Sequence, residues 1–126
     1  MGYTTIFHID DDHDDIYYFA AAIEHLSGTA KCFSFANAAK ALHTLQSGEI
    51  LPDAIFLDLN MPVINGQEFL AQLKASKGLG DIPVIILSTS EDPDTQQQLK
   101  AEGARGFLTK PSSVKELAQL LRPYFT

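Results

Sequence analysis

The chain has 126 residues, 45% of them hydrophobic, and a formal net charge of −7 from 9 basic and 16 acidic residues. This length predicts one domain over residues 1–126, with enough apolar material for a core that needs no disulfide or metal to fold. The few basic residues argue against nucleic-acid binding, and no apolar run reaches the roughly 18 residues of a membrane span. The N-terminus lacks the basic region of a signal peptide, and the single cysteine, Cys32, cannot form an internal disulfide. We therefore expect a cytoplasmic protein without membrane or nucleic-acid partners.

Short apolar runs alternate with amphipathic segments along the whole chain. The apolar runs predict strands at 6–9, 30–34, 54–57, 84–87 and 106–108. Helical patterns follow at 16–26 and 36–46, and then after positions 65, 92 and 113. Each predicted strand is thus followed by a predicted helix.

Residues typical of helix ends stand at the boundaries of these segments. Asn65, with Glu68 three positions later, resembles a capping box. Asp92 precedes a proline suited to the first helical position, and Ser113 begins a second capping-box pattern. Gly48 is placed to end the helix predicted at 36–46.

This alternation predicts an α/β fold with a parallel sheet and helices on both of its faces. The strands at 54–57 and 84–87 are continuous apolar runs, as expected for strands buried on both sides. Five such units favour the flavodoxin-like (βα)5 doubly wound sheet with strand order 2-1-3-4-5. In sheets of this kind, ligands bind beyond the carboxyl ends of the strands.

Polar side chains stand at four of those strand ends. In the order 2-1-3-4-5 the four strands are neighbours, so these side chains should converge on one cleft. In chain order the residues are Asp10, Asp11 and Asp12 after the first strand, Asp58 and Asn60 after the third, Ser88 after the fourth, and Lys110 after the fifth.

The chemistry of this set indicates a metal-assisted phosphoryl acceptor. Clustered carboxylates repel one another, and a hard divalent cation with oxygen ligands, Mg²⁺ by default, removes that cost. We expect Asp11 and Asp58 to bind the metal directly, Asp10 directly or through water, and Asn60 through its backbone carbonyl. Asp58 would then attack phosphorus as a nucleophile.

Four motifs, in order and at the right strand ends, resemble the signature of response-regulator receiver domains. The resemblance implies that Asp58 is the phosphoacceptor in a two-component phosphorelay. It further implies a sensor histidine kinase or histidine phosphotransfer protein as donor, and an unidentified downstream protein that binds a switched face. The motifs are IDDD at 9–12, LDLNMP at 57–62 with Gly66, PVIILS at 83–88, and FLTKP at 107–111.

The resemblance also assigns roles to the other polar residues. Asp10 and Asp11 correspond to the acid pair, and Lys110 to the lysine that contacts the phosphate. Ser88 corresponds to the hydroxyl that contacts the phosphate and acts in the switch, where the family commonly has threonine. Phe107 corresponds to the switch aromatic, where the family often has tyrosine. Such a module catalyses only its own phosphorylation and dephosphorylation and is not otherwise an enzyme.

Two other functions remain open from the residues alone. Asp10 and Asp12 match the Asp-x-Asp pattern of phosphohydrolases that form an aspartyl phosphate, although that interpretation leaves Asp58 without a role. A receiver-like scaffold that works unphosphorylated is the second, and the intact acceptor set speaks against it. Asp12 itself has an open role, since acids before a helix are often only N-caps.

Three further expectations concern structural detail. The peptide bond between Lys110 and Pro111 should be cis, because the chain must turn there while aiming the lysine into the cleft. The four histidines, which form no pair at metal-binding spacing, should be structural or surface residues. Phosphorylation should switch the face formed by the fourth helix, the fifth strand and the fifth helix, through Ser88 and Phe107.

Overall fold

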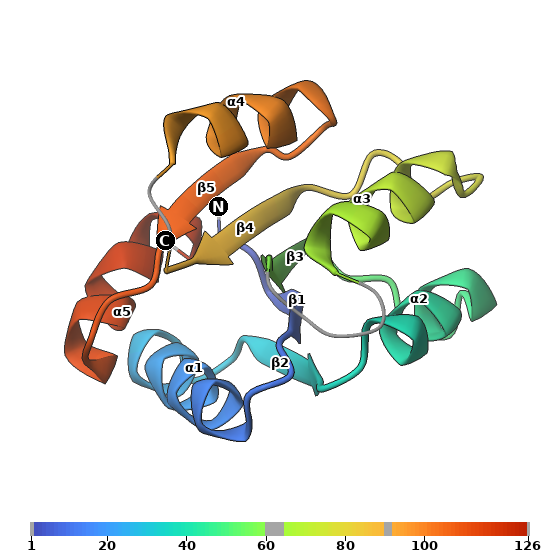
Figure 1. Cartoon of the computed structure of the whole chain (residues 1–126). Helices are drawn as coiled ribbons and strands as arrows, with labels where there is room; N and C mark the ends of the chain where they lie inside the picture. The colour runs from blue at the N-terminus through green and yellow to red at the C-terminus, as the bar shows by residue number, and fades with distance from the viewer. Residues whose placement is uncertain (1, 60–64, 90–91, 126) are drawn as a thin grey trace.

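A computed structural model describes residues 2–59, 65–89 and 92–125 of the chain. Its five strands form one parallel sheet in the order β2-β1-β3-β4-β5, which confirms the predicted flavodoxin-like topology (Figure 1). The strands are β1 (Thr5–Ile9), β2 (Lys31–Phe35), β3 (Ala54–Asp58), β4 (Val84–Ser88) and β5 (Gly106–Thr109).

Helices connect successive strands and cover both faces of the sheet (Figure 1). Each strand pair is parallel, so a crossover is needed between them, and the helices supply it. The helices are α1 (His13–Leu26), α2 (Ala38–Ser47), α3 (Gly66–Ala75), α4 (Pro93–Ala101) and α5 (Val114–Leu121), followed by the 3-10 turn η1 (Arg122–Tyr124).

Alternate residues of the central strands pack into two separate cores. In β3, Ile55 and Leu57 face a core shared with α2, α3 and Leu99 of α4, whereas Phe56 faces a core shared with α1 and α5. Because side chains alternate across a strand, a continuous apolar run can fill both cores at once. This burial fixes the sheet and leaves the carboxyl ends of the strands as the edge where polar groups gather.

The predicted capping residues act as expected, with small shifts in the helix bounds. Asn65 and Glu68 form a complete capping box for α3, Asp92 caps α4, and Gly48 ends α2 in the left-handed conformation with φ of 73°. Helix α1 begins at His13, three residues before the predicted start, because Asp12 accepts hydrogen bonds from two backbone N–H groups of its first turn.

The predicted cis peptide bond between Lys110 and Pro111 is wrong, because this bond is trans. The backbone N–H of Lys110 donates to the carbonyl of Ser88 at 2.8 Å, which holds the chain beside β4 after β5 has ended. Residues 111–113 then make the turn, and the Ser113 side chain caps α5. Three residues are enough to direct the chain into the helix without a cis bond.

No helix within residues 2–59, 65–89 and 92–125 is long and apolar enough to cross a membrane.

Candidate phosphoryl acceptor site

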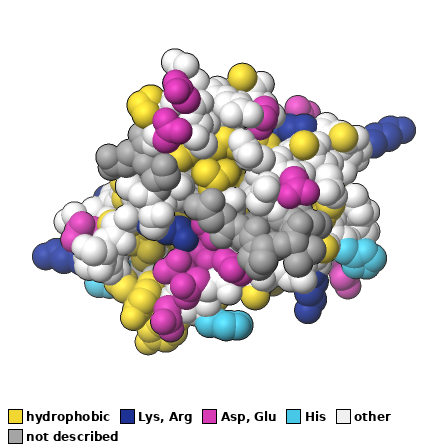
Figure 2. Space-filling view, in the orientation of Figure 1, with side chains coloured by type: hydrophobic (Ala, Val, Ile, Leu, Met, Phe, Trp, Pro, Cys, Tyr) yellow, Lys and Arg dark blue, Asp and Glu magenta, His cyan; other side chains and the backbone are white. Residues whose placement is uncertain are grey.

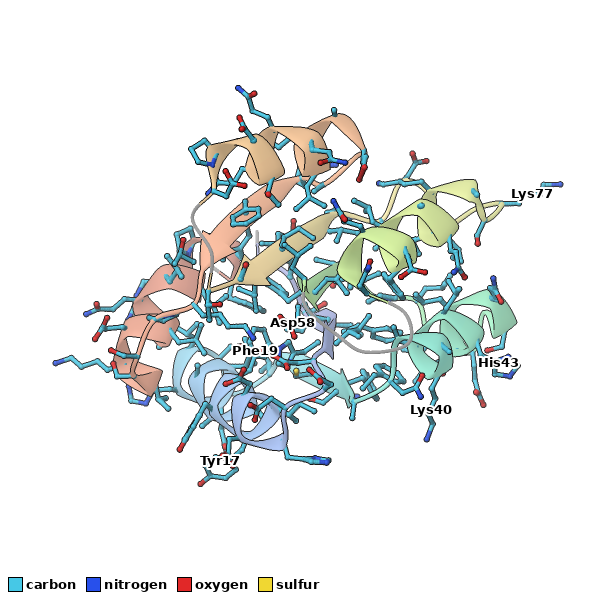
Figure 3. All side chains as sticks on the ribbon, in the orientation of Figure 1. Tyr17, Phe19, Lys40, His43, Asp58 and Lys77 are labelled. Carbon is cyan, nitrogen blue, oxygen red and sulfur yellow. The ribbon has the colours of Figure 1, made fainter. Side chains whose placement is uncertain are left out.

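Four chain segments bring the predicted polar residues together at the carboxyl edge of the sheet. Asp58 is the last residue of β3, in the centre of the sheet, and is 5% exposed (Figure 3). Asp10 follows β1 directly, Ser88 ends β4, and both are buried. Lys110 follows β5. On the face of the molecule drawn in Figure 2, acidic side chains are gathered beside a basic one.

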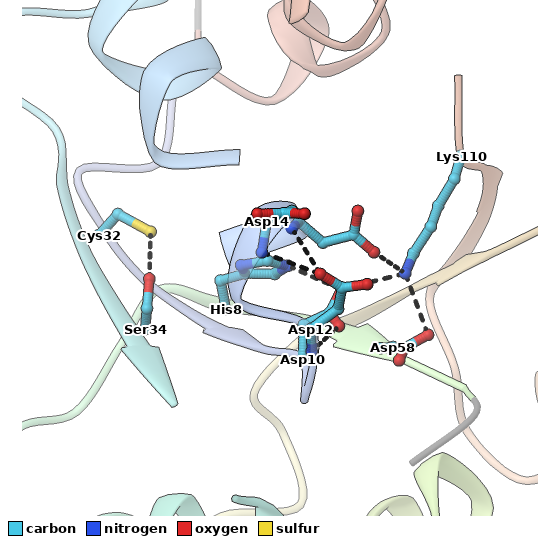
Figure 4. Close-up of polar contacts among 9 residues, drawn as sticks. His8, Asp10, Asp12, Asp14, Cys32, Ser34, Asp58 and Lys110 are labelled. Atoms are coloured by element: carbon cyan, nitrogen blue, oxygen red, sulfur yellow. Dashed lines mark hydrogen bonds and ion pairs between the residues drawn. The ribbon is translucent and has the colours of Figure 1, made fainter. Parts of the chain in front are cut away.

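The ammonium group of Lys110 connects three carboxylates in this cleft (Figure 4). Its Nζ lies 3.0 Å from Asp10 Oδ2, 2.9 Å from Asp15 Oδ2 and 3.3 Å from Asp58 Oδ1. Burial would by itself lower the pKa of Lys110, but the hydrogen bonds that its ammonium donates to Asp15 and Asp10 outweigh burial and raise the pKa. The lysine is therefore a permanent cation beside Asp58.

Asp10 is the most enclosed acid of the site. Only 1% of its surface is exposed, and burial raises its pKa to about 6, with Asp58 adding to the effect. The backbone N–H of Asp12 donates to Asp10 Oδ1 at 3.0 Å, and this bond and Lys110 partly oppose the rise. Because Asp10 is buried, a positive charge close to it is needed to stabilise its ionised form.

The carboxylates also form a group that fits a metal ion. One oxygen each from Asp10, Asp11 and Asp58 lies within 4.8 Å of the others, with Asp11 exposed and the other two buried. Several carboxylate oxygens with one open side suit a hard divalent cation that keeps some of its water. Asn60, the fourth expected ligand, lies outside the described residues.

Close packing of α3 against the end of β3 requires a glycine. The N–H of Gly66 donates to the carbonyl of Leu59 at 2.9 Å. A Cβ atom on Gly66 would lie 2.8 Å from the carbonyl oxygen of Asp58 and 2.8 Å from Cα of Leu59. Any other residue at Gly66 would push α3 away from the segment that holds Asp58.

The structure places the two predicted switch residues on adjacent strands. Ser88 is fully buried at the end of β4, and its backbone carbonyl binds the N–H of Lys110. Phe107 lies on β5, partly buried against the core beneath α4. Ser88 is thus tied to the lysine of the site, and Phe107 pairs in register with Ile86 on the same strand as Ser88.

Asp12 and Asp15 have positions that the sequence left open or did not predict. Asp12, whose role was open, caps α1 through its side chain. Asp15 looks from the sequence like an ordinary acid near a helix start, yet it is a direct partner of Lys110. The available signal was its place in the first turn of the helix that follows Asp10, which brings it back to the cleft.

The histidines are structural or surface residues, as expected, and one of them is deeply buried. His8 on β1 stacks on Phe19 of α1, with ring centroids 3.9 Å apart. Its pKa falls to about 3 because of burial and, second, the charge of Lys110, so its ring is neutral. His8 Nε2 lies 3.8 Å from Asp10 Oδ2. A cavity of about 360 Å³ between α1 and α5 borders these residues and Lys110.

Comparisons with known proteins agree on one family. A family model described as the response regulator receiver domain matches residues 6–122. The probable methanogenesis regulatory protein FilR2 of Methanothrix harundinacea is 30% identical over 113 residues, covering 86% of this chain and 73% of that protein. Seven further curated relatives are longer than this chain, which covers between 10% and 46% of their lengths.

Solved structures give the same result. The phosphorylated cyanobacterial phytochrome response regulator RcpA is similar with a TM-score of 0.86 and 27% identity, covering 97% of this chain and 91% of that one. The Mn²⁺-bound response regulator Rcp1 has a TM-score of 0.83 and 25% identity, covering 95% and 90%. The fold, the order of the site residues and these matches together show that the chain belongs to the response regulator receiver domains of two-component signalling.

Proposed function

We propose that Asp58 is the residue of this receiver domain that accepts a phosphoryl group. The observation that carries the proposal is the ammonium of Lys110 held 3.3 Å from Asp58 Oδ1 at the end of a buried strand. A buried carboxylate beside a fixed cation is both restrained and partly neutralised. Phosphoryl transfer needs mainly positioning and charge stabilisation, which this arrangement supplies.

In the proposed reaction, an oxygen of the Asp58 carboxylate attacks the phosphorus of a phosphohistidine on a donor protein. The P–N bond breaks, its electron pair returns to the imidazole of the donor, and Asp58 becomes an acyl phosphate. Lys110 supplies hydrogen bonds and positive charge to the transferred oxygens. Ser88 supplies a hydroxyl at the end of the neighbouring strand. On this proposal the protein catalyses its own phosphorylation and dephosphorylation and is not otherwise an enzyme.

We further propose that Mg²⁺ is held by Asp10, Asp11 and Asp58, with the backbone carbonyl of Asn60 as a fourth ligand. The fit rests on the three carboxylate oxygens within 4.8 Å and on the raised pKa of Asp10, which shows how costly its negative charge is there. When bound, Mg²⁺ supplies charge neutralisation for the acceptor and the transferred oxygens. The similar response regulator Rcp1 binds a divalent ion, Mn²⁺, in its solved structure.

Phosphorylation is proposed to change the face formed by α4, β5 and α5. Ser88 would follow the phosphate, and Phe107 would turn into the space beside β5, so a small shift becomes one of two discrete packings. The partly buried position of Phe107 supports this, because the side chain already contacts the core and is also partly exposed to solvent. The output would be contact with a downstream protein.

Receiver domains of response regulators interact with histidine kinases, and a sensor kinase or phosphotransfer protein is the proposed donor here. A cytoplasmic location is proposed from the single free Cys32, which suits a reducing compartment. The phosphohydrolase alternative is not favoured, because the Asp12 side chain of its Asp-x-Asp pattern is engaged in capping α1.

Intact-mass spectrometry after incubation with acetyl phosphate and Mg²⁺ tests this proposal. We expect one added phosphoryl group in the wild type, with none in Asp58→Asn and little when the metal is chelated. Asp53→Asn is a matched control, because Asp53 is an exposed acid that binds the backbone of Thr4 and Thr5 at the opposite end of β3. Equal labelling of the wild type and Asp58→Asn would contradict the assignment.

A further inference from the structure

The ammonium group of Lys110 donates hydrogen bonds to Asp10 and Asp15 and forms an ion pair with Asp58. Two of these carboxylates, Asp10 and Asp58, belong to the proposed acceptor site, and the third, Asp15, lies in the first turn of α1. Asp15 makes the shortest of the three contacts, at 2.9 Å, against 3.3 Å for Asp58. The lysine on which the proposed reaction depends is therefore shared with a residue outside the acceptor site.

We propose that Asp15 is a positioning residue that competes with the phosphoryl group for Lys110 and thereby restrains phosphorylation of Asp58. This inference rests on the proposed function of Asp58. In the unphosphorylated protein, the ion pair with the partly exposed Asp15 keeps the ammonium group of Lys110 close to α1. When Asp58 is phosphorylated, the bond between Lys110 and Asp15 breaks and Lys110 binds the phosphoryl oxygens.

The burial of the three acids determines which bond can be given up. Asp10 is 1% exposed, so losing Lys110 would leave a buried carboxylate without its cation, which is costly. Asp15 is 39% exposed, so water can replace the lysine there at small cost. The phosphoryl group offers three oxygens in place of the single Asp58 oxygen beside the lysine. Two N–H bonds of Lys110 are engaged by Asp10 and Asp15, so releasing Asp15 gives the phosphoryl oxygens one more donor.

The charge balance of the cleft acts in the same direction. Three carboxylates share one ammonium, so this group of four side chains carries a net charge of −2. An incoming phosphoryl donor is itself an anion, and each further negative charge near the cleft opposes it. Replacing Asp15 by asparagine removes one of these charges and weakens the bond to Lys110, because a neutral amide oxygen accepts a hydrogen bond more weakly than a carboxylate does.

Asp14 offers a matched control for the charge alone. It stands next to Asp15, is exposed, and is the other acid in the first turn of α1. Within the described part of the chain, Lys110 forms ion pairs with Asp10, Asp15 and Asp58 and not with Asp14. Asp14→Asn and Asp15→Asn therefore remove the same charge from the same helix end, and only the second removes an ion pair with Lys110.

Beryllofluoride, an anion that mimics a phosphoryl group on aspartate, is the probe, and its affinity is measured by NMR titration of the whole chain at saturating Mg²⁺. Saturation keeps any change in metal affinity from entering the result. We expect Asp15→Asn to bind beryllofluoride about threefold more tightly than the wild type, as expected for loss of a partly exposed ion pair. Asp14→Asn should change the affinity by less than about 1.5-fold, as expected for an exposed charge. Asp15→Glu, which restores the charge, should return toward the wild type.

The outcomes separate the two proposals. If the wild type binds beryllofluoride and Asp15→Asn binds it no more tightly, the role of Asp15 is overturned and the proposed function stands. An equal gain in beryllofluoride affinity in Asp14→Asn and Asp15→Asn would also overturn the role of Asp15. The loss of one negative charge from the helix end would then explain both results. A wild type that binds no beryllofluoride would overturn the proposed function and this inference together. Asp15→Ser serves as a second variant and should tighten binding as Asp15→Asn does.

Discussion

The buried ring of His8 should make the folding stability of this protein depend on pH in a way that one substitution removes. The pKa of His8 is about 3 in the folded protein and 6.5 as a reference for the unfolded chain. A group with a depressed folded pKa contributes stability that is present above its unfolded pKa and is lost as the pH falls toward its folded pKa. The contribution of His8 is thus complete above pH 6.5 and declines below it.

The size of this loss follows from the two pKa values. At about pH 5 the unfolded chain has taken up the proton and the folded protein has not, so the loss is 1.5 pH units at about 1.4 kcal/mol each, or about 2 kcal/mol. Asp10 faces His8 and acts oppositely, because its pKa is raised to about 6 and its protonation below that pH stabilises the fold. Since Asp10 is present in both proteins, comparing the wild type with His8→Phe isolates the histidine.

Urea unfolding followed by circular dichroism, at about pH 7.5 and about pH 5, measures the effect. Phenylalanine can keep the stacking on Phe19, so His8→Phe should fold. On acidification the wild type should lose about 2 kcal/mol more than His8→Phe. The exposed His43 of α2 provides a control, and His43→Gln should follow the wild type (Figure 3). Parallel losses in the wild type and His8→Phe would refute the reasoning.

Three further predictions concern the site and its support. Asp11→Asn should abolish most of the rise in melting temperature that Mg²⁺ produces in the wild type, and thermal scans with and without the metal check this. Ser88→Ala should accept phosphate on Asp58 but respond poorly, and identical NMR shift changes around Phe107 and α4 in both phosphorylated proteins would argue against the coupling. Asn65→Ala removes the side-chain acceptor of the capping box and should lower the free energy of unfolding by about 1 kcal/mol, as measured in urea.

The sheet and the position of the site could be predicted because they follow from patterns local to each segment. The apolar runs ending at Leu57 and Leu87 locate two central strands, and a polar residue follows each run directly. The parallel topology then brings these residues to one edge whatever the details of packing. The caps at Asn65 and Asp92 were predictable for the same reason, since the capping residue and its backbone partner are close in sequence.

The details that failed or were missed depend on contacts between distant segments. The trans bond before Pro111 follows from how β5 leaves the sheet beside Ser88, which no local pattern reveals. The hydrogen bond between Lys110 and Asp15 joins residues 95 positions apart. From the sequence, Asp15 looks like an ordinary acidic residue at the start of a helix. The burial of His8 depends on α1 packing across β1, where the ring meets Phe19.

Direct mapping of the phosphorylated residue is the sharpest test of the account. The protein is incubated with acetyl phosphate and Mg²⁺ and then treated with borohydride, which reduces an acyl phosphate on aspartate to homoserine. Peptide mass spectrometry then locates the change. We predict conversion at Asp58 and at no other acid, with Asp10, Asp11 and Asp15 unmodified. Conversion at Asp10 or Asp11, or its persistence at another acid in Asp58→Asn, would contradict the central claim that Asp58 receives the phosphoryl group.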